Sequence, residues 1–170
     1  MLFENLCGNC SHKNCCTDSA VPLVFSKDLE KIKKKDLQYV EHLKTVEING
    51  KQVTAVKKKE GSTECIFWDA DVGGCAIYDA RPMDCRLYPF DILSIENSYH
   101  WIVYSCNDDS DWSWSEDHLK SLENDNGFND LMKNLDLFSE HTNMILPSES
   151  EKTPYKILRK VIWDGNFVTG

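Results

Sequence analysis

The apolar residues of the N-terminal third follow the spacing of an extended segment and then that of a helix. Val21-Pro22-Leu23-Val24-Phe25 is predicted to be extended, and Ser26 is a candidate N-cap for a helix that runs to about Leu43. The apolar positions of this predicted helix lie on one face and are Leu29, Ile32, Leu37, Val40 and Leu43.

Three pairs of short segments further along the chain predict β-hairpins. Asn-Gly between two alternating segments is the strongest short-range hairpin signal, and paired glycines also supply a turn. The predicted hairpins are 45–56 with the turn at Asn49-Gly50, 66–68 with 76–78 around Gly73-Gly74, and 91–95 with 100–104 turning at 96–98.

From Ser115 onward the spacing becomes helical. The apolar positions of this region are Leu119, Leu122, Leu131, Leu135 and Phe138. Gly127 is predicted to interrupt it, Pro147 to end it, and Pro154 to open a last helix that contains Tyr155 to Trp163. We therefore expect an α+β fold in a single domain, 1–170. Residues 1–110 would form a cysteine-rich, loop-dominated metal-binding part with short antiparallel hairpins, and residues 111–170 a helical support.

Composition and charge narrow the class of protein. Hydrophobic residues make up 41% of the chain and charged residues 28%, which is typical of a folded protein. The net charge of −9 repels phosphate backbones, so nucleic acid is not the expected partner. Two lysine clusters, at 31, 33, 34 and 35 and at 57, 58 and 59, leave a local basic patch open, although solvent-facing positions explain them more simply. With no basic leader and no long apolar run, we expect a cytoplasmic protein outside the membrane.

The cysteines carry the candidate chemistry. In a reducing compartment, clustered cysteines are more often metal ligands than disulfides. Four structural disulfides or scattered unliganded core thiols remain the simpler alternatives. The candidate metal ligands are Cys7, Cys10, Cys15, Cys16, Cys65, Cys75, Cys85 and Cys106.

The spacing of the cysteines indicates how they would act. Cys7 and Cys10 form a C-x-x-C knuckle that can bring two thiolates to one metal. Cys15 and Cys16 are adjacent, so one of the two can face a different metal or pack against the protein. The cysteines at 65, 75 and 85 recur in turn-rich sequence, where backbone N–H groups can donate to sulfur. Cys106 follows a predicted strand. The alternative interpretation of Cys106 is an inert buried thiol that binds no metal.

A resemblance to a known family rests on these residues. Cys7-x-x-Cys10, Cys15-Cys16, Cys65 and the segment 75–90, which reads C-x-I-Y-x-x-R-P-x-x-C-R-x-Y-P-F, resemble the YkgJ-type cysteine-cluster family of zinc- or iron-chelating CxxCxxCC domains. The resemblance implies metal binding, usually by an iron–sulfur cluster, and no settled activity. Four residues, including His12, separate Cys10 from Cys15, where the family has fewer. Whether Cys15 or Cys16 would take the ligand position therefore stays open.

Two arginines near Cys85 have a physical interpretation of their own. Pro82 disfavours helical backbone at Arg81. Arg81 and Arg86 would then flank the Cys85 thiolate with positive charge and lower its pKa. Alternatively, either arginine pairs with an acidic neighbour, for which the candidates are Asp79, Asp84 and Asp91.

Three functions are compatible with this pattern. We favour an iron–sulfur protein, with a 4Fe–4S cluster, that serves in redox or electron transfer or as an accessory to a modifying enzyme, together with a protein or redox partner. The second is a structural zinc module that binds a partner, and the third is a component of a methyltransferase-like enzyme. One cluster is favoured over two. No catalytic motif is found.

Overall fold

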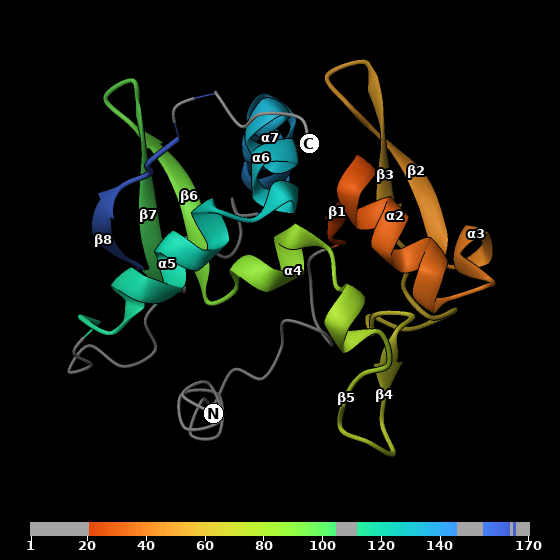
Figure 1. Cartoon of the computed structure of the whole chain (residues 1–170). Coiled ribbons are helices and arrows are strands. Elements are labelled where there is room, and N and C mark those ends of the chain that lie inside the picture. Colours follow the sequence, from red (N-terminus) through yellow and green to blue (C-terminus); the bar gives the residue numbers. More distant parts are fainter. Residues whose placement is uncertain (1–20, 105–111, 146–154, 164, 166–170) are drawn as a thin grey trace.

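The N-terminal half of the described chain builds a three-stranded antiparallel sheet. The computed structural model describes residues 21–104, 112–145, 155–163 and 165 (Figure 1). The sheet has the order β1-β3-β2. Its strands and the helices that precede β2 are β1 (Leu23–Val24), α2 (Ser26–Lys35), α3 (Tyr39–His42), β2 (Leu43–Ile48) and β3 (Lys51–Val56).

A short irregular region follows and leads to a second sheet. Its elements are the two-stranded pair β4 (Trp68–Asp69) and β5 (Gly74–Cys75), the 3-10 helix η2 (Tyr78–Ala80) and α4 (Met83–Leu87). The second sheet has the order β6-β7-β8 and consists of β6 (Phe90–Ile95), β7 (Ser98–Tyr104) and β8 (Tyr155–Lys160).

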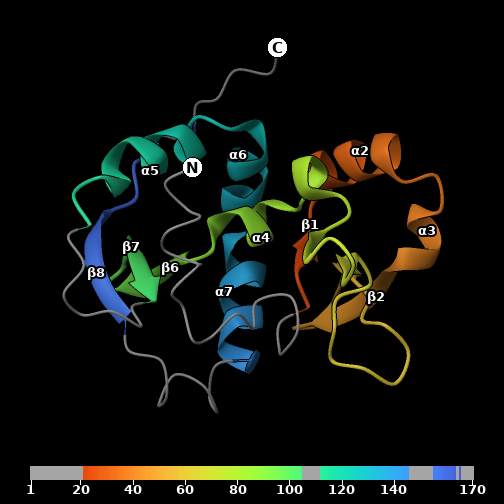
Figure 2. The ribbon, with the colours of Figure 1, turned by 90° about the horizontal axis from the view of Figure 1, so that it is seen from below.

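Three helices separate β7 from β8 along the chain: α5 (Ser115–Glu123), α6 (Asn126–Lys133) and α7 (Leu135–Ile145). Figures 1 and 2 both show α6 and α7 between the two three-stranded sheets, with α4 crossing beside them. The Trp101 and Phe128 rings stack here with centroids 5.4 Å apart, joining β7 to α6 in the main core. A second core packs β1, α2 and β3 against the irregular region, and Cys65 and Cys75 contact it.

The predicted α+β class and the three hairpins are confirmed. Asn49 and Gly50 turn the first hairpin with φ angles of 50° and 74°, values that favour glycine and asparagine. The second hairpin is shorter than predicted, since its register pairs Trp68 with Cys75. The third follows the predicted strands closely, with Phe90 opposite Val103.

The first helix differs from the prediction at both ends. Phe25, not Ser26, is the N-cap, and its N–H donates to Asp28 Oδ2 at 3.2 Å. The helix ends at Lys35 because Asp36 adopts extended backbone and its carboxylate engages the Gln38 N–H (3.0 Å) and His42 Nδ1 (2.6 Å). These local bonds compete with continued helix, which resumes only as the single turn α3.

The predicted last helix is wrong, because residues 155–160 form strand β8. This segment pairs along the edge of β7, with Tyr155 opposite Tyr104 and Lys160 opposite His100. Buried Glu123 holds its end by accepting from Arg159 Nη1 (2.7 Å) and from the Ile162 N–H (2.9 Å). Tertiary pairing therefore overrides a local pattern that also fits a helix.

The interruption predicted at Gly127 falls slightly earlier. α5 ends at Glu123, and Asp125 caps α6 by accepting from the Gly127 N–H at 2.7 Å. Gly127 itself lies in the first turn of α6. Within the described ranges, no helix has the length and apolar character needed to cross a membrane.

Candidate metal centre

Three of the predicted ligands belong to the described chain, two of them in short β pairings and one in a helix. Cys65 follows β3 and forms an isolated antiparallel bridge with Lys58. Cys75 ends β5, opposite Trp68. Cys85 lies in α4, and all three thiols are free and half-buried. Cys7, Cys10, Cys15, Cys16 and Cys106, together with His12, lie outside the described residues.

The fold brings these three thiols into electrostatic contact. Desolvation raises the pKa of Cys65 and of Cys75, and it raises the pKa of Cys85 furthest above its ordinary value. Asp84, Cys65 and Cys75 add to the rise at Cys85 because a second negative charge nearby disfavours its thiolate. Residues that are ten apart in sequence therefore lie close enough for their charges to interact.

Backbone N–H groups are directed at two of the sulfurs. The amides of Phe67 and Trp68 hydrogen-bond to Cys65, and the amide of Ile77 to Cys75, and each bond lowers the pKa of the thiol that accepts it. Such donors offset the charge of a thiolate and tune a bound metal. The expectation that turn amides face sulfur is confirmed for these two cysteines.

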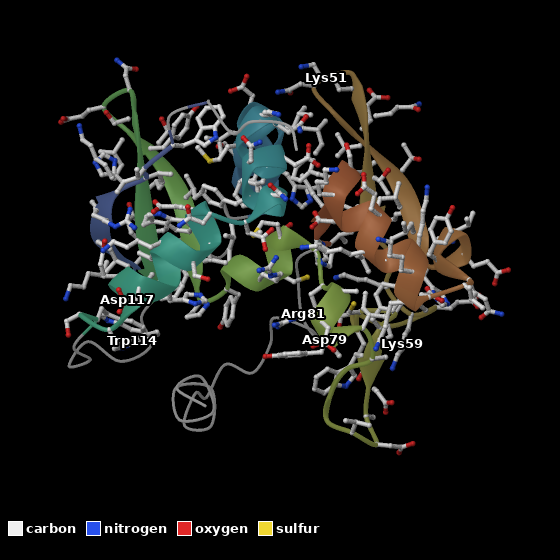
Figure 3. The ribbon with its side chains drawn as sticks, in the orientation of Figure 1. Lys51, Lys59, Asp79, Arg81, Trp114 and Asp117 are labelled. Carbon is white, nitrogen blue, oxygen red and sulfur yellow. The ribbon has the colours of Figure 1, made fainter. Side chains whose placement is uncertain are left out.

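Arg81 supplies the positive charge predicted beside the cysteines. Burial raises the pKa of both Cys75 and Cys85, and the Arg81 guanidinium only partly offsets this rise. The prediction that the two arginines lower the pKa of Cys85 is therefore wrong, because desolvation outweighs the charge of Arg81, and Arg86 does not contribute. The Arg81 side chain is held by the Tyr78 ring, whose centroid is 3.7 Å from Cζ, and by the Tyr78 carbonyl, which accepts from Nε at 2.9 Å. Arg81 has φ −54° and ψ 140°, as expected before Pro82. Figure 3 shows its labelled side chain near Asp79 and below α4.

Arg86 has another role. It pairs with Asp125 at 2.8 Å, a partner on α6 that the sequence did not suggest. The ion pair ties α4, and with it Cys85, to the N-terminus of α6.

Two carboxylates tie α4 to α2 and to β1, and the sequence alone predicted neither role. Asp28 Oδ1 accepts from the Met83 N–H at 2.9 Å, and Asp84 Oδ2 accepts from the Leu23 N–H at 2.8 Å. Desolvation raises the pKa of Asp28 to about 6 and of Asp84 to about 7. The only sequence signal for Asp28 is its place as an acidic residue in the first turn of a predicted helix. That signal does not identify its distant partner, Met83.

The donor set fits a thiophilic group. Within the described part of the chain, no group of three or more His, Cys, Asp or Glu side chains is spaced to hold a metal ion by itself. Thiols whose charges interact, amide donors at two of them and a neighbouring guanidinium are nevertheless the chemistry with which proteins support soft metals.

Two ends of the described chain lie near α4 or its carboxylate Asp84, next to the segments that carry the other predicted ligands. The described chain begins beside α4, because the Leu23 N–H bonds to Asp84. An extended chain from Cys16 to Val21 spans at most about 18 Å. Cys106 is two residues beyond Tyr104, whose pKa is raised by desolvation and in part by the charge of Asp84.

Comparison with known proteins decides the family. Residues 6–107 match the CxxCxxCC family, described as "Putative zinc- or iron-chelating domain". The chain belongs to this family. The match contains all eight cysteines and supports metal binding. The helices α5 to α7 and strand β8 lie beyond the matched residues. No curated protein and no solved structure matches the chain.

Proposed function

We propose that this CxxCxxCC protein holds an iron–sulfur cluster, of the 4Fe–4S type, and serves in electron transfer or as an accessory to a modifying enzyme. The observation that supports the proposal is that Cys65, Cys75 and Cys85 lie close enough for their charges to interact, with backbone N–H donors to the first two sulfurs. The N-terminal cysteines and Cys106 are the proposed source of further ligands.

The chain's own residues would set the properties of such a site. Arg81 offsets negative charge at Cys75 and Cys85, and the amides of Phe67, Trp68 and Ile77 stabilise the thiolates. Phe67 and Ile77 are buried in the second core, against which Cys65 and Cys75 pack, and they limit the access of water to these two cysteines. A bound cluster supplies one-electron chemistry whose potential depends on hydrogen bonds to sulfur, on charge and on solvent exposure.

Zinc is the second candidate, because the family description includes it and amide-supported cysteine turns suit zinc as well. In that case the metal would stabilise the turns at Cys65, Cys75 and Cys85, and the protein would function by binding a partner.

Metal analysis of anaerobically purified protein separates the two candidates. An iron–sulfur protein is brown with broad visible absorbance, and about four irons and four sulfides per chain indicate one cluster, about eight of each two clusters. A colourless protein with stoichiometric zinc and no sulfide would reject the cluster and support the zinc module.

A further inference from the structure

Two aliphatic side chains, three positions apart in the sequence, are exposed at α3 and just before it. Leu37 is 93% exposed and Val40 67% exposed. Exposed apolar residues are common when single, but neighbouring ones with polar surroundings mark interaction sites. Figures 1 and 2 place α3 at the outer edge of the molecule, where a partner has open access.

The two lysine clusters of the sequence meet at this place. Lys33 Nζ lies 5.4 Å from the centroid of the Tyr39 ring, and Lys57 Nζ donates to the Glu41 carbonyl at 2.7 Å. Lys35 and Lys59 both line a hollow of about 500 Å³ beside α3. We call this region the α3 surface, and its members are Lys33, Lys34, Lys35, Leu37, Val40, Lys57 and Lys59.

The α3 surface keeps a net positive charge on a chain of net charge −9. Its five lysines outnumber the four acidic residues near it: Asp36 is engaged by His42 at 2.6 Å, Glu64 pairs with Lys59 at 3.0 Å, Glu41 is exposed, and Asp69 lines the same hollow. Lysines at the end of α2 are also favoured by the helix dipole. The dipole does not explain why Leu37 and Val40 stay in water.

From this combination we infer that the α3 surface docks a partner protein that presents carboxylates around an apolar side chain. Apolar contact with Leu37 and Val40 would supply affinity, and the lysines would supply orientation and a faster association. The inference goes beyond the metal centre and does not depend on which metal is bound.

Charge argues against the other occupants. A second copy of the chain would place the same lysines against each other across a two-fold axis. An anionic membrane or a nucleic acid is an extended polyanion, which would also face the acidic remainder of the chain. A protein partner can confine its carboxylates to the area of the α3 surface.

The surface borders a cysteine turn. The Ile66 N–H donates to the Lys57 carbonyl at 3.0 Å, and Lys58 forms its bridge with Cys65. A docked partner would therefore lie beside Cys65.

Binding of a labelled synthetic peptide, with one Leu and one Phe among glutamates, to the metal-loaded full chain tests the inference. The double variants Leu37→Ser/Val40→Ser and Lys34→Glu/Lys35→Glu should each bind about tenfold more weakly than wild type. Wild-type affinity should also fall as salt is added.

Matched controls are Val72→Ser, at a side chain 78% exposed on the β4–β5 turn, and Lys51→Glu, at the first residue of β3 next to the β2–β3 turn. Figure 3 labels Lys51 at the tip of the β2–β3 hairpin and Lys59 far from it, beyond the other end of β3. Both controls should bind like wild type, and all variants should keep their metal, which separates this test from that of the metal centre. The inference would be overturned if the peptide did not bind, or if the controls lost as much affinity as the double variants. It would also be overturned if phosphatidylserine vesicles or duplex DNA bound more tightly than the peptide through the same residues.

Discussion

At the scale of single residues, the site depends on carboxylates that accept from backbone N–H groups. Asp28 is fully buried and joins the start of α2 to the start of α4 through the N–H groups of Phe25 and Met83. Three cysteines and Arg81 could be named from the sequence because family spacing and the Arg-Pro step identify them. Asp28 and Asp125 could not, because their partners are 55 and 39 residues away.

Asp28 makes stability depend on pH. Its pKa is raised from 3.8 to about 6, mainly by desolvation, so between these values the folded state holds a proton that the unfolded state releases. The contribution of Asp28 to the unfolding free energy therefore falls by about 3 kcal/mol as pH rises from below 4 to above 6. Urea unfolding across this range should show a smaller decline in Asp28→Asn than in wild type. The same decline in both proteins would contradict the assignment.

At the scale of elements, prediction succeeded where local signals agree with the final contacts. The hairpin at Asn49-Gly50 and the strands β6 and β7 follow from turn residues and alternation. The sequence did not predict the end of the helix at Asp36, because it depends on the Asp36 side chain reaching His42. It did not predict strand β8 either, because that strand forms by pairing with the edge of β7. The clamp at Glu123, which joins α5 to β7 and β8, was equally invisible in the sequence.

Glu123 is expected to hold β8 in place. Its carboxylate is 5% exposed and accepts from Trp101 Nε1 at 2.8 Å and from Arg159 Nη1 at 2.7 Å. Glu123→Gln should lower the free energy of unfolding by about 2–4 kcal/mol, because it removes the buried one of the two charge partners of Arg159. Glu116, an exposed partner of the same arginine, is the control, and Glu116→Gln should cost less than about 1 kcal/mol in the same urea titration. Equal losses would contradict a buried clamp.

At the scale of the whole molecule, the metal is expected to stabilise one region more than the other. The segment 57–87 has only two-residue strands and short helices around its cysteines, whereas β6 to β8 pack on α5 and α6 through a large core. After anaerobic chelation, hydrogen exchange should accelerate in 57–87 and change little in 90–104 and 115–133. Unchanged exchange in 57–87 would mean that the metal has no structural role there.

The central claim is that cysteines distant in sequence hold one metal centre. The most direct test is the iron, zinc and sulfide content of anaerobically purified Cys75→Ser and Cys85→Ser beside wild type, with Cys10→Ser and Cys106→Ser added. A hydroxyl replaces a thiolate ligand poorly, so Cys75→Ser, Cys85→Ser and Cys10→Ser should lose the same metal, and Cys106→Ser should lose less. Full retention of the wild-type metal in Cys85→Ser would contradict the site.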